Sequence, residues 1–295
     1  MIDFRYHALS LVAVFLALAI GIVLGVTVGD SLVSEADKGV RNSLRGDVIE
    51  AREQAREARA EVGQRDRMIA AALPILLDRR LEGKRIGFVS TGDLPGGVRD
   101  GVRGGVEGAA GTLDSTSSLG LPGELAALAG AAGEDGTQIA RSPDLARDFG
   151  RELGRSLAVG GKLARRLKEE LPDRFEGDYD GADAIVLLRA PLERPQGDES
   201  AAAERRIDAA EAFERGLVDG LREDDVTVVG VEQTDTDPSQ VGFYEESGLS
   251  SVDNVDQDAG EAALAIALAG TREGSFGVKK GADAPFPALR DSGSR

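Results

Sequence analysis

An uncharged apolar run near the amino terminus constrains this chain more than any other feature. Residues 8–28 read ALSLVAVFLALAIGIVLGVTV and contain no Asp, Glu, Lys or Arg. As a helix this run spans about 30 Å, which matches the hydrocarbon core of a bilayer. The sequence therefore predicts a single membrane anchor over residues 1–30, and everything after it is held at a membrane.

A cleaved signal peptide is the alternative interpretation of this run. The run exceeds the roughly 7–15 apolar residues of a signal peptide, and no A-x-A pattern follows Val28. We therefore expect the segment to remain attached. Lys38, Arg41 and Arg45 follow the run and only Arg5 precedes it, which by a strict count favours a cytoplasmic domain. Because large domains cross regardless of charge, we expect the amino terminus in the cytoplasm and the carboxyl-terminal domain outside.

Small residues recur every four positions along the anchor. On a helix this spacing forms one continuous ridge, and the doubled G-x-x-x-G pattern within it is typical of helices that pack closely in lipid. The ridge predicts self-association of the anchor, unless it only reflects the abundance of Ala and Gly. Its members are Ala13, Ala17, Gly21, Gly25 and Gly29.

Residues 31–80 predict a second helical segment, a coiled-coil stalk. No Pro occurs between the anchor and Pro74, and Ala, Glu, Arg and Leu are frequent. A seam of mostly apolar residues recurs at steps of three and four, interrupted by stutters, which is typical of a heptad repeat. A solvated single helix is the alternative, but an isolated helix gains little stability. We expect a parallel homo-oligomer, most simply a dimer. The seam comprises Val33, Ala36, Val40, Leu44, Val48, Ala51, Ala55, Ala58, Val62, Arg65, Ile69 and Ala72.

Composition excludes several classes of function. The net charge is −17, and residues 81–295 carry all of it, because residues 1–30 hold −1 and residues 31–80 hold +1. A nucleic-acid-binding surface needs the opposite sign. The chain has no Cys and its one His is His7, so thiolate metal sites and a distal Ser-His-Asp triad are excluded. We expect no enzyme, no resident cofactor and no metal site; a membrane-tethered enzyme that uses only carboxylates is the remaining alternative.

Residues 81–285 alternate between apolar strands and helices, which predicts a Rossmann-like α/β domain with a parallel sheet. Residues 184–188 and 226–231 are apolar on both faces, as buried parallel strands are. We expect further strands at 85–90, 112–119 and, at an edge, 249–255. We expect helices at 121–133, 142–171, 199–221 and 258–269, a weak one at the glycine-rich segment 94–110, and a loose tail at 286–295.

Two groups of residues in this domain are candidates for ligand binding. Ser90-Thr91-Gly92 lies between a strand and a helix, where an anion site would form, but neither nucleotide-binding glycine motif is present. Acidic residues gather at Asp235 and Asp237 and again at Asp253, Asp256, Asp258 and Glu261. Such clusters can bind Ca²⁺ or Mg²⁺, but helix amino termini attract acids for electrostatic reasons alone, and we favour this second explanation.

Three segments resemble a known family. The amino terminus carries Asp3, Phe4, Arg5, Tyr6 and His7 ahead of the apolar run. Two further matching segments are Ser251-Val252-Asp253-Asn254-Val255-Asp256 and Gly274-Ser275-Phe276-Gly277-Val278 followed by Pro285-Phe286-Pro287. Together they are similar to the mycobacterial copper transport protein B family of actinobacterial envelope proteins. The resemblance implies copper efflux or homeostasis through the cell envelope. The alternative from the residues alone is a non-enzymatic scaffold that self-associates at a membrane.

Overall fold

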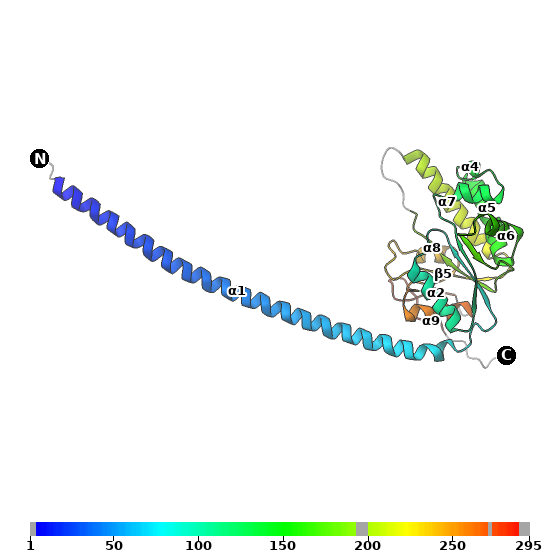
Figure 1. Cartoon of the computed structure of the whole chain (residues 1–295), viewed down its shortest axis with the longest axis horizontal. Coiled ribbons are helices and arrows are strands. Elements are labelled where there is room, and N and C mark those ends of the chain that lie inside the picture. Colours follow the sequence, from blue (N-terminus) through cyan, green and yellow to red (C-terminus); the bar gives the residue numbers. More distant parts are fainter. Residues whose placement is uncertain (1–3, 193–199, 271–272, 289–295) are drawn as a thin grey trace. The chain divides into compact units, whose positions relative to one another are not determined.

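A computed structural model describes residues 4–192, 200–270 and 273–288. Its contacts divide the chain into two compact units, Met1–Arg65 and Asp66–Arg295. Helix α1, Phe4–Leu77, accounts for the described part of the first unit and continues into the second (Figure 1). Pro74 lies in its last turn and, because it has no N–H, cannot donate to the carbonyl four residues before it. The helical conformation predicted for the anchor and the stalk is therefore confirmed over residues 4–77.

Every side chain of α1 that is described between residues 9 and 62 is exposed. Among the described residues, no helix combines the length and the apolarity needed to cross a membrane. Of the predicted anchor, residues 9–25 have described side chains, whereas those of residues 8 and 26–28 lie outside the description, as does Gly29 of the predicted ridge. The membrane span and the coiled coil stay predictions from the sequence.

A seven-stranded sheet forms the centre of the second unit, in the order β3-β2-β1-β4-β5-β6-β7. All neighbouring strands pair parallel except β2 and β3, so the predicted parallel-sheet α/β fold is confirmed. The strands are β1 Arg85–Ser90, β2 Thr112–Ser118, β3 Phe175–Gly177, β4 Ala184–Leu188, β5 Thr227–Val231, β6 Ser250–Val252 and β7 Ser275–Phe276. The prediction of an edge strand at 249–255 is wrong in its position, because β7 pairs with β6 and takes the edge.

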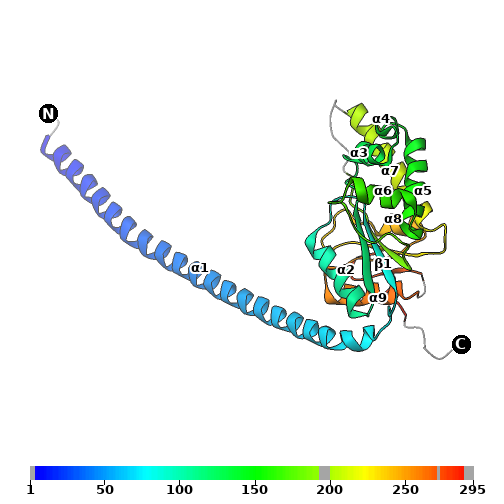
Figure 2. The same cartoon turned by 45° about the vertical axis from the view of Figure 1, so that its right-hand side comes forward.

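Helices cover both faces of this sheet. Helices α2, Gly96–Gly108, and α9, Asp258–Leu268, pack on one face, and both views place them side by side (Figures 1 and 2). The opposite face carries the larger core cluster. Its main helices are α3 Leu125–Ala132, α5 Pro143–Val159, α6 Lys162–Glu170 and α7 Ser200–Leu221. Leu77 and Leu81 are buried in the core beside α2, so the end of α1 belongs to this unit.

The single helix predicted at 142–171 is two helices. Ser142 accepts a hydrogen bond from the amide of Leu145 and caps α5 at its start. Gly160 adopts a left-handed conformation, with φ of 77°, and ends α5. The short helices α4, Gly136–Ile139, and α8, Val241–Glu246, were not predicted.

The glycine-rich segment predicted to be a weak helix forms α2, and its glycines are contact positions. A Cβ on Gly101 would lie 1.9 Å from the carbonyl oxygen of Val255, and one on Gly105 would lie 2.6 Å from that of Glu261. Residues with side chains could not approach this closely. The packing against α9 thus offsets the low intrinsic helix propensity of glycine.

Helices α5 and α7 also meet through glycine. Gly150 and Gly154 of α5 face backbone atoms of α7, and Gly216 and Gly220 of α7 face carbonyls of α5. At each of the four positions, an added Cβ would lie 2.0 to 2.2 Å from a carbonyl oxygen of the other helix. Both helices carry the G-x-x-x-G spacing, so the two backbones are in direct contact and fix how α7 crosses the sheet.

Candidate functional site

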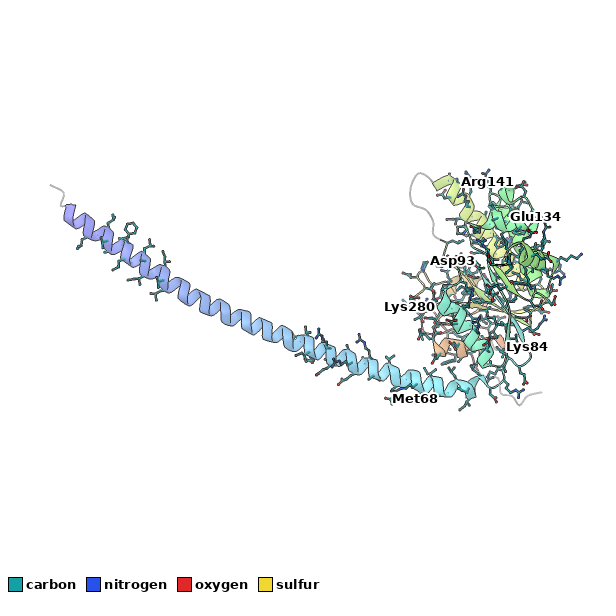
Figure 3. The ribbon with its side chains drawn as sticks, viewed as in Figure 1. Met68, Lys84, Asp93, Glu134, Arg141 and Lys280 are labelled. Atoms are coloured by element: carbon teal, nitrogen blue, oxygen red, sulfur yellow. The ribbon has the colours of Figure 1, made fainter. Side chains whose placement is uncertain are left out.

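The carboxyl end of the sheet is where a doubly wound domain binds ligands, at the point where the strand order reverses. Here the reversal lies between β1 and β4, which are neighbours although β2 and β3 lie between them in the chain. Asp93, just after β1, marks this end of the domain and Lys84, just before β1, marks the other (Figure 3). The predicted Ser90-Thr91-Gly92 segment lies at the reversal.

Internal hydrogen bonds occupy the loop after β1. The hydroxyl of Ser90 donates to the carbonyls of Gly92 and Asp93, both at 3.0 Å, and Ser118 donates to Gly92 at 2.8 Å. A Cβ on Gly92 would lie only 2.5 Å from the Cβ of Ala190. The loop therefore packs directly on the end of β4 and turns carbonyl oxygens toward its own hydroxyls, unlike the N–H cradle that binds phosphate.

A buried ion pair follows β4. Arg189 donates from Nε to Oε2 of Glu214 at 2.8 Å, and these side chains are 15% and 1% exposed. Its Nη1 also donates to Gln240, and its guanidinium lies 4.3 Å above the Phe243 ring. The hydroxyl of Tyr244 accepts the Arg189 amide at 2.8 Å. Burial raises the pKa of Glu214, and the charge of Arg189 opposes that rise.

A second buried pair follows β5. Lys279 donates from Nζ to Oε1 of Glu232 at 2.7 Å and to the carbonyl of Thr236 at 2.9 Å. Glu232 is fully buried and also accepts from the hydroxyl of Ser239 and the amide of Gln240. Its charge is therefore satisfied by one cation and two neutral donors.

Asp253 connects the two carboxyl-terminal segments of the family resemblance. Its Oδ1 accepts from the amide of Val278 and its Oδ2 from the amide of Lys279, both at 2.8 Å. Gly277 permits this approach, since a Cβ there would lie 1.9 Å from Oδ1 and its φ is 139°. Val252 lies in β6 and Asn254 directly follows Asp253, both buried. The structure thus brings these two motifs together.

These side chains form one cluster, which we call the carboxyl-edge network: Arg189, Glu214, Glu232, Gln240, Asp253 and Lys279. Gln240 joins the Arg189 half to the Glu232 half, because its side chain contacts Arg189 and its backbone amide donates to Glu232. Arg189 pairs with Glu214 and Lys279 with Glu232, while backbone amides hold the third carboxylate, Asp253. Chemically, this arrangement fixes the ends of β4 to β7 in place.

The acidic residues predicted from the sequence lie in different environments. Partial burial of Asp256 works against ionisation, but hydrogen bonds from the amide and hydroxyl of Thr234, at 2.7 and 2.9 Å, lower its pKa overall. Burial, helped by Asp258, raises the pKa of Glu261 to about 7. Asp235 and Asp237 are exposed. Within the described residues, no three acidic or histidine side chains are placed to share a metal ion.

Sequence reasoning missed every member of the network except Asp253, although signals existed. Arg189 and Glu232 each come directly after a largely apolar strand of five residues. Glu214 shares the buried face of α7 with Phe213 and Leu217. A charge at the end of a buried strand, or alone on an apolar helix face, indicates a buried partner. Of the amino-terminal motif, Asp3 lies outside the described residues, and residues 4–7 are helical without described side chains.

Comparison with known proteins identifies the family of the chain. No curated protein matches the chain. The family model described as copper transport outer membrane protein, MctB, matches residues 1–287 of the 295. This match includes the predicted anchor, the predicted stalk and the whole α/β domain with its carboxyl-edge network. The chain therefore belongs to the MctB family of copper transport outer membrane proteins.

Proposed function

We propose that this protein serves copper export or homeostasis at the cell envelope as a membrane-anchored, non-enzymatic component. The observation that carries the proposal is the match to the copper transport family over residues 1–287. The carboxyl-edge network supports the non-enzymatic part, since both of its cations are paired with buried carboxylates.

In this proposal copper is the cargo of the system and is not held by the α/β domain. Cu(I) binds thiolate, thioether and imidazole ligands. The chain has no Cys, and its only Met and His residues are Met1, Met68 and His7. The polar side chains of the domain are chiefly carboxylates and guanidiniums, which are poor ligands for a soft ion. The domain would then act on the copper pathway through another protein.

The proposal includes a topology. Residues 8–28 cross a membrane once, the amino terminus lies in the cytoplasm and the α/β domain lies outside it. The uncharged apolar run supports the span, and the missing cleavage pattern supports its retention. The intact mass of the membrane-extracted protein tests retention, because a species that starts near Ser31 would identify the run as a signal peptide.

Growth of a deletion strain under copper tests the function. We expect the strain to grow normally without added copper, to stop at lower copper concentrations than the parent, and to recover with the full chain. A second strain that expresses residues 31–295 behind a cleavable signal peptide should not recover, because the domain is no longer anchored. Equal copper tolerance of parent and deletion strain would refute a role in copper handling.

A second candidate function is that of a self-associating scaffold that holds partners at the membrane. The observation that favours it is the exposure of the apolar seam of α1 over residues 48–62, including Val48 and Val62. Such a seam is stabilised when another helix covers it. The two functions are compatible, and the copper growth assay distinguishes a general scaffold from one dedicated to copper.

A further inference from the structure

One face of α1 carries a regular heptad seam that no described part of the chain covers. Taking Val48 as position a, the seam alternates a and d positions through two heptads, and every member is exposed. The seam residues are Val48, Ala51, Ala55, Ala58 and Val62. A groove of about 510 Å³ lies along the first three seam residues, Val48, Ala51 and Ala55, and is bounded on one side by Arg52, Arg56 and Arg59. The face is thus an apolar strip with a cationic border.

We infer that the occupant of this groove is the same segment of a second copy of the chain, parallel and in register. The inference deepens the proposed self-association and rests on it. It adds the orientation of the two helices, their register and the residues that determine both.

Flanking charges make the face complementary to itself in the parallel arrangement. Arg52 and Arg59 occupy e positions, and Asp47 and Gln54 occupy the g positions five residues before them. In a parallel pair each g side chain meets the following e side chain of the partner. Asp47 then faces Arg52 of the other copy, and twofold symmetry forms this ion pair twice. Gln54 faces Arg59 without charge conflict.

The antiparallel arrangement is disfavoured by the same residues. There, e positions face e positions and g positions face g positions, so Arg52 and Arg59 would meet one another. Asp47 and Glu61 would likewise meet across the other border. Like charges in this setting repel, and coiled coils use this effect to fix strand orientation.

The seam also has a defined end. Position d of the third heptad is Arg65, whose guanidinium lies 2.6 Å from Glu61 of its own helix. The next g and e positions in the sequence are Glu61 and Asp66, two acids. The first compact unit ends at Arg65. The paired segment described here therefore runs from Asp47 to Val62, with three Ala residues at its centre that let the backbones approach closely.

Single cysteines test the register, because the chain has none of its own. Ala58→Cys places a thiol at d, facing its counterpart, and the matched control Ala60→Cys places one at f, facing away. In membranes that carry the full chain, mild diamide oxidation should give at least about tenfold more disulfide-linked dimer for Ala58→Cys. Equal cross-linking of the two variants would overturn the arrangement.

A charge exchange tests the orientation in the Ala58→Cys background. Arg52→Glu sets a carboxylate against Asp47 of the other copy and should reduce the cross-linked fraction several-fold at low salt. Adding Asp47→Arg restores opposite charges with reversed sign and should restore cross-linking. Failure of this rescue would contradict the parallel pairing.

Copper tolerance is measured on the same variants to separate this inference from the proposed function. If the deletion strain is copper-sensitive and the Ala58→Cys chain restores its growth without forming cross-linked dimer, the copper role stands and the dimer is refuted. If Ala58→Cys cross-links but the deletion strain shows no copper phenotype, the dimer stands and the copper role is refuted.

Discussion

At the scale of single residues, the Glu232–Lys279 pair sets how much the carboxyl-edge network stabilises the domain. Glu232 is fully buried and Lys279 is 17% exposed, so loss of the cation leaves an anion that water cannot reach. Removal of one partner from a buried pair typically costs about 3–5 kcal/mol, whereas removal of both is often close to neutral.

We therefore predict that Lys279→Met lowers the free energy of unfolding by about 3 kcal/mol. The variant with both Lys279→Met and Glu232→Gln should recover most of this loss, since no charge is left buried. Urea denaturation of residues 66–295, followed by circular dichroism, measures both. A double variant as unstable as the single one would show that packing of Lys279, and not its charge, is what matters.

Glu261 predicts a pH dependence. Its pKa is raised to about 7 by burial and by Asp258, so the folded state binds a proton more tightly than the unfolded chain. The free energy of unfolding should then fall as pH rises from about 4.5, the ordinary range for Glu, to about 7. The carboxyl is partly exposed, so we expect a loss of only about 1 kcal/mol.

Glu261→Gln should remove this component and leave the rest of the pH profile unchanged. The measurement is the difference in unfolding free energy between variant and parent at several pH values from 5 to 8. A constant difference across that range would contradict the assignment to Glu261.

At the scale of elements, the glycine contacts between α5 and α7 determine the packing on one face of the sheet. A Cβ on Gly154 would lie 2.2 Å from the carbonyl of Leu217, so one helix must move. We predict that Gly154→Ala destabilises the domain by about 1–3 kcal/mol. Gly130→Ala in α3 is the control, since nothing lies within 4 Å of its added Cβ, and it should stabilise by about 0.5–1 kcal/mol. Equal effects would show that the α5–α7 contact can open freely.

The anchor carries its own packing prediction. Nothing lies within 4 Å of a Cβ added to Gly21 or Gly25, so the ridge has room for a neighbouring helix. Gly25→Leu should weaken association in a membrane two-hybrid assay because bulk would separate the backbones. Ala19→Leu adds bulk on the opposite face and should leave association intact. Unchanged association of Gly25→Leu would assign assembly to the stalk alone.

The local pattern of apolar residues predicted the strands that are buried along nearly their whole length. Strands β1, β4 and β5 are continuous buried runs, and each was expected within a residue of its bounds. Strands β3 and β7 have three and two residues, too few to show a period. The split of residues 142–171 depends on Gly160, whose left-handed conformation only the folded chain reveals.

The candidate site was predictable only in part, for a physical reason. Asp253 and Asn254 were named through their family motif, while Arg189 and Glu214 were not named at all. The network members come from separate segments that the sheet brings together, and pairs such as Lys279 and Glu232 lie 47 positions apart. Periodicity describes a face of one element and carries no information about which distant charge will meet it.

At the scale of the whole molecule, the chain combines an apolar amino-terminal run with a domain that carries all of the net negative charge. We predict that residues 66–295 lose Cu(I) to a chelator of sub-micromolar affinity, since Met68 is the only soft ligand among them. Absorbance of the chelator complex measures the competition. Stoichiometric retention by the protein would place copper on the domain itself.

The network has a consequence for the order in which the chain becomes available for folding. A chain that emerges from the ribosome, or from a membrane pore, presents its residues from the amino to the carboxyl end. Glu232 and Asp253 are thus synthesised before Lys279. The side chain of Lys279 supplies the cation for Glu232, and its backbone amide donates to Asp253. Until then the last three strands cannot close without enclosing a Glu232 carboxylate that has no cation beside it. Folding of the domain therefore waits for the segment that contains Lys279. A chain that stops just short of Lys279 should remain a substrate for proteases even though every strand of the sheet has been made.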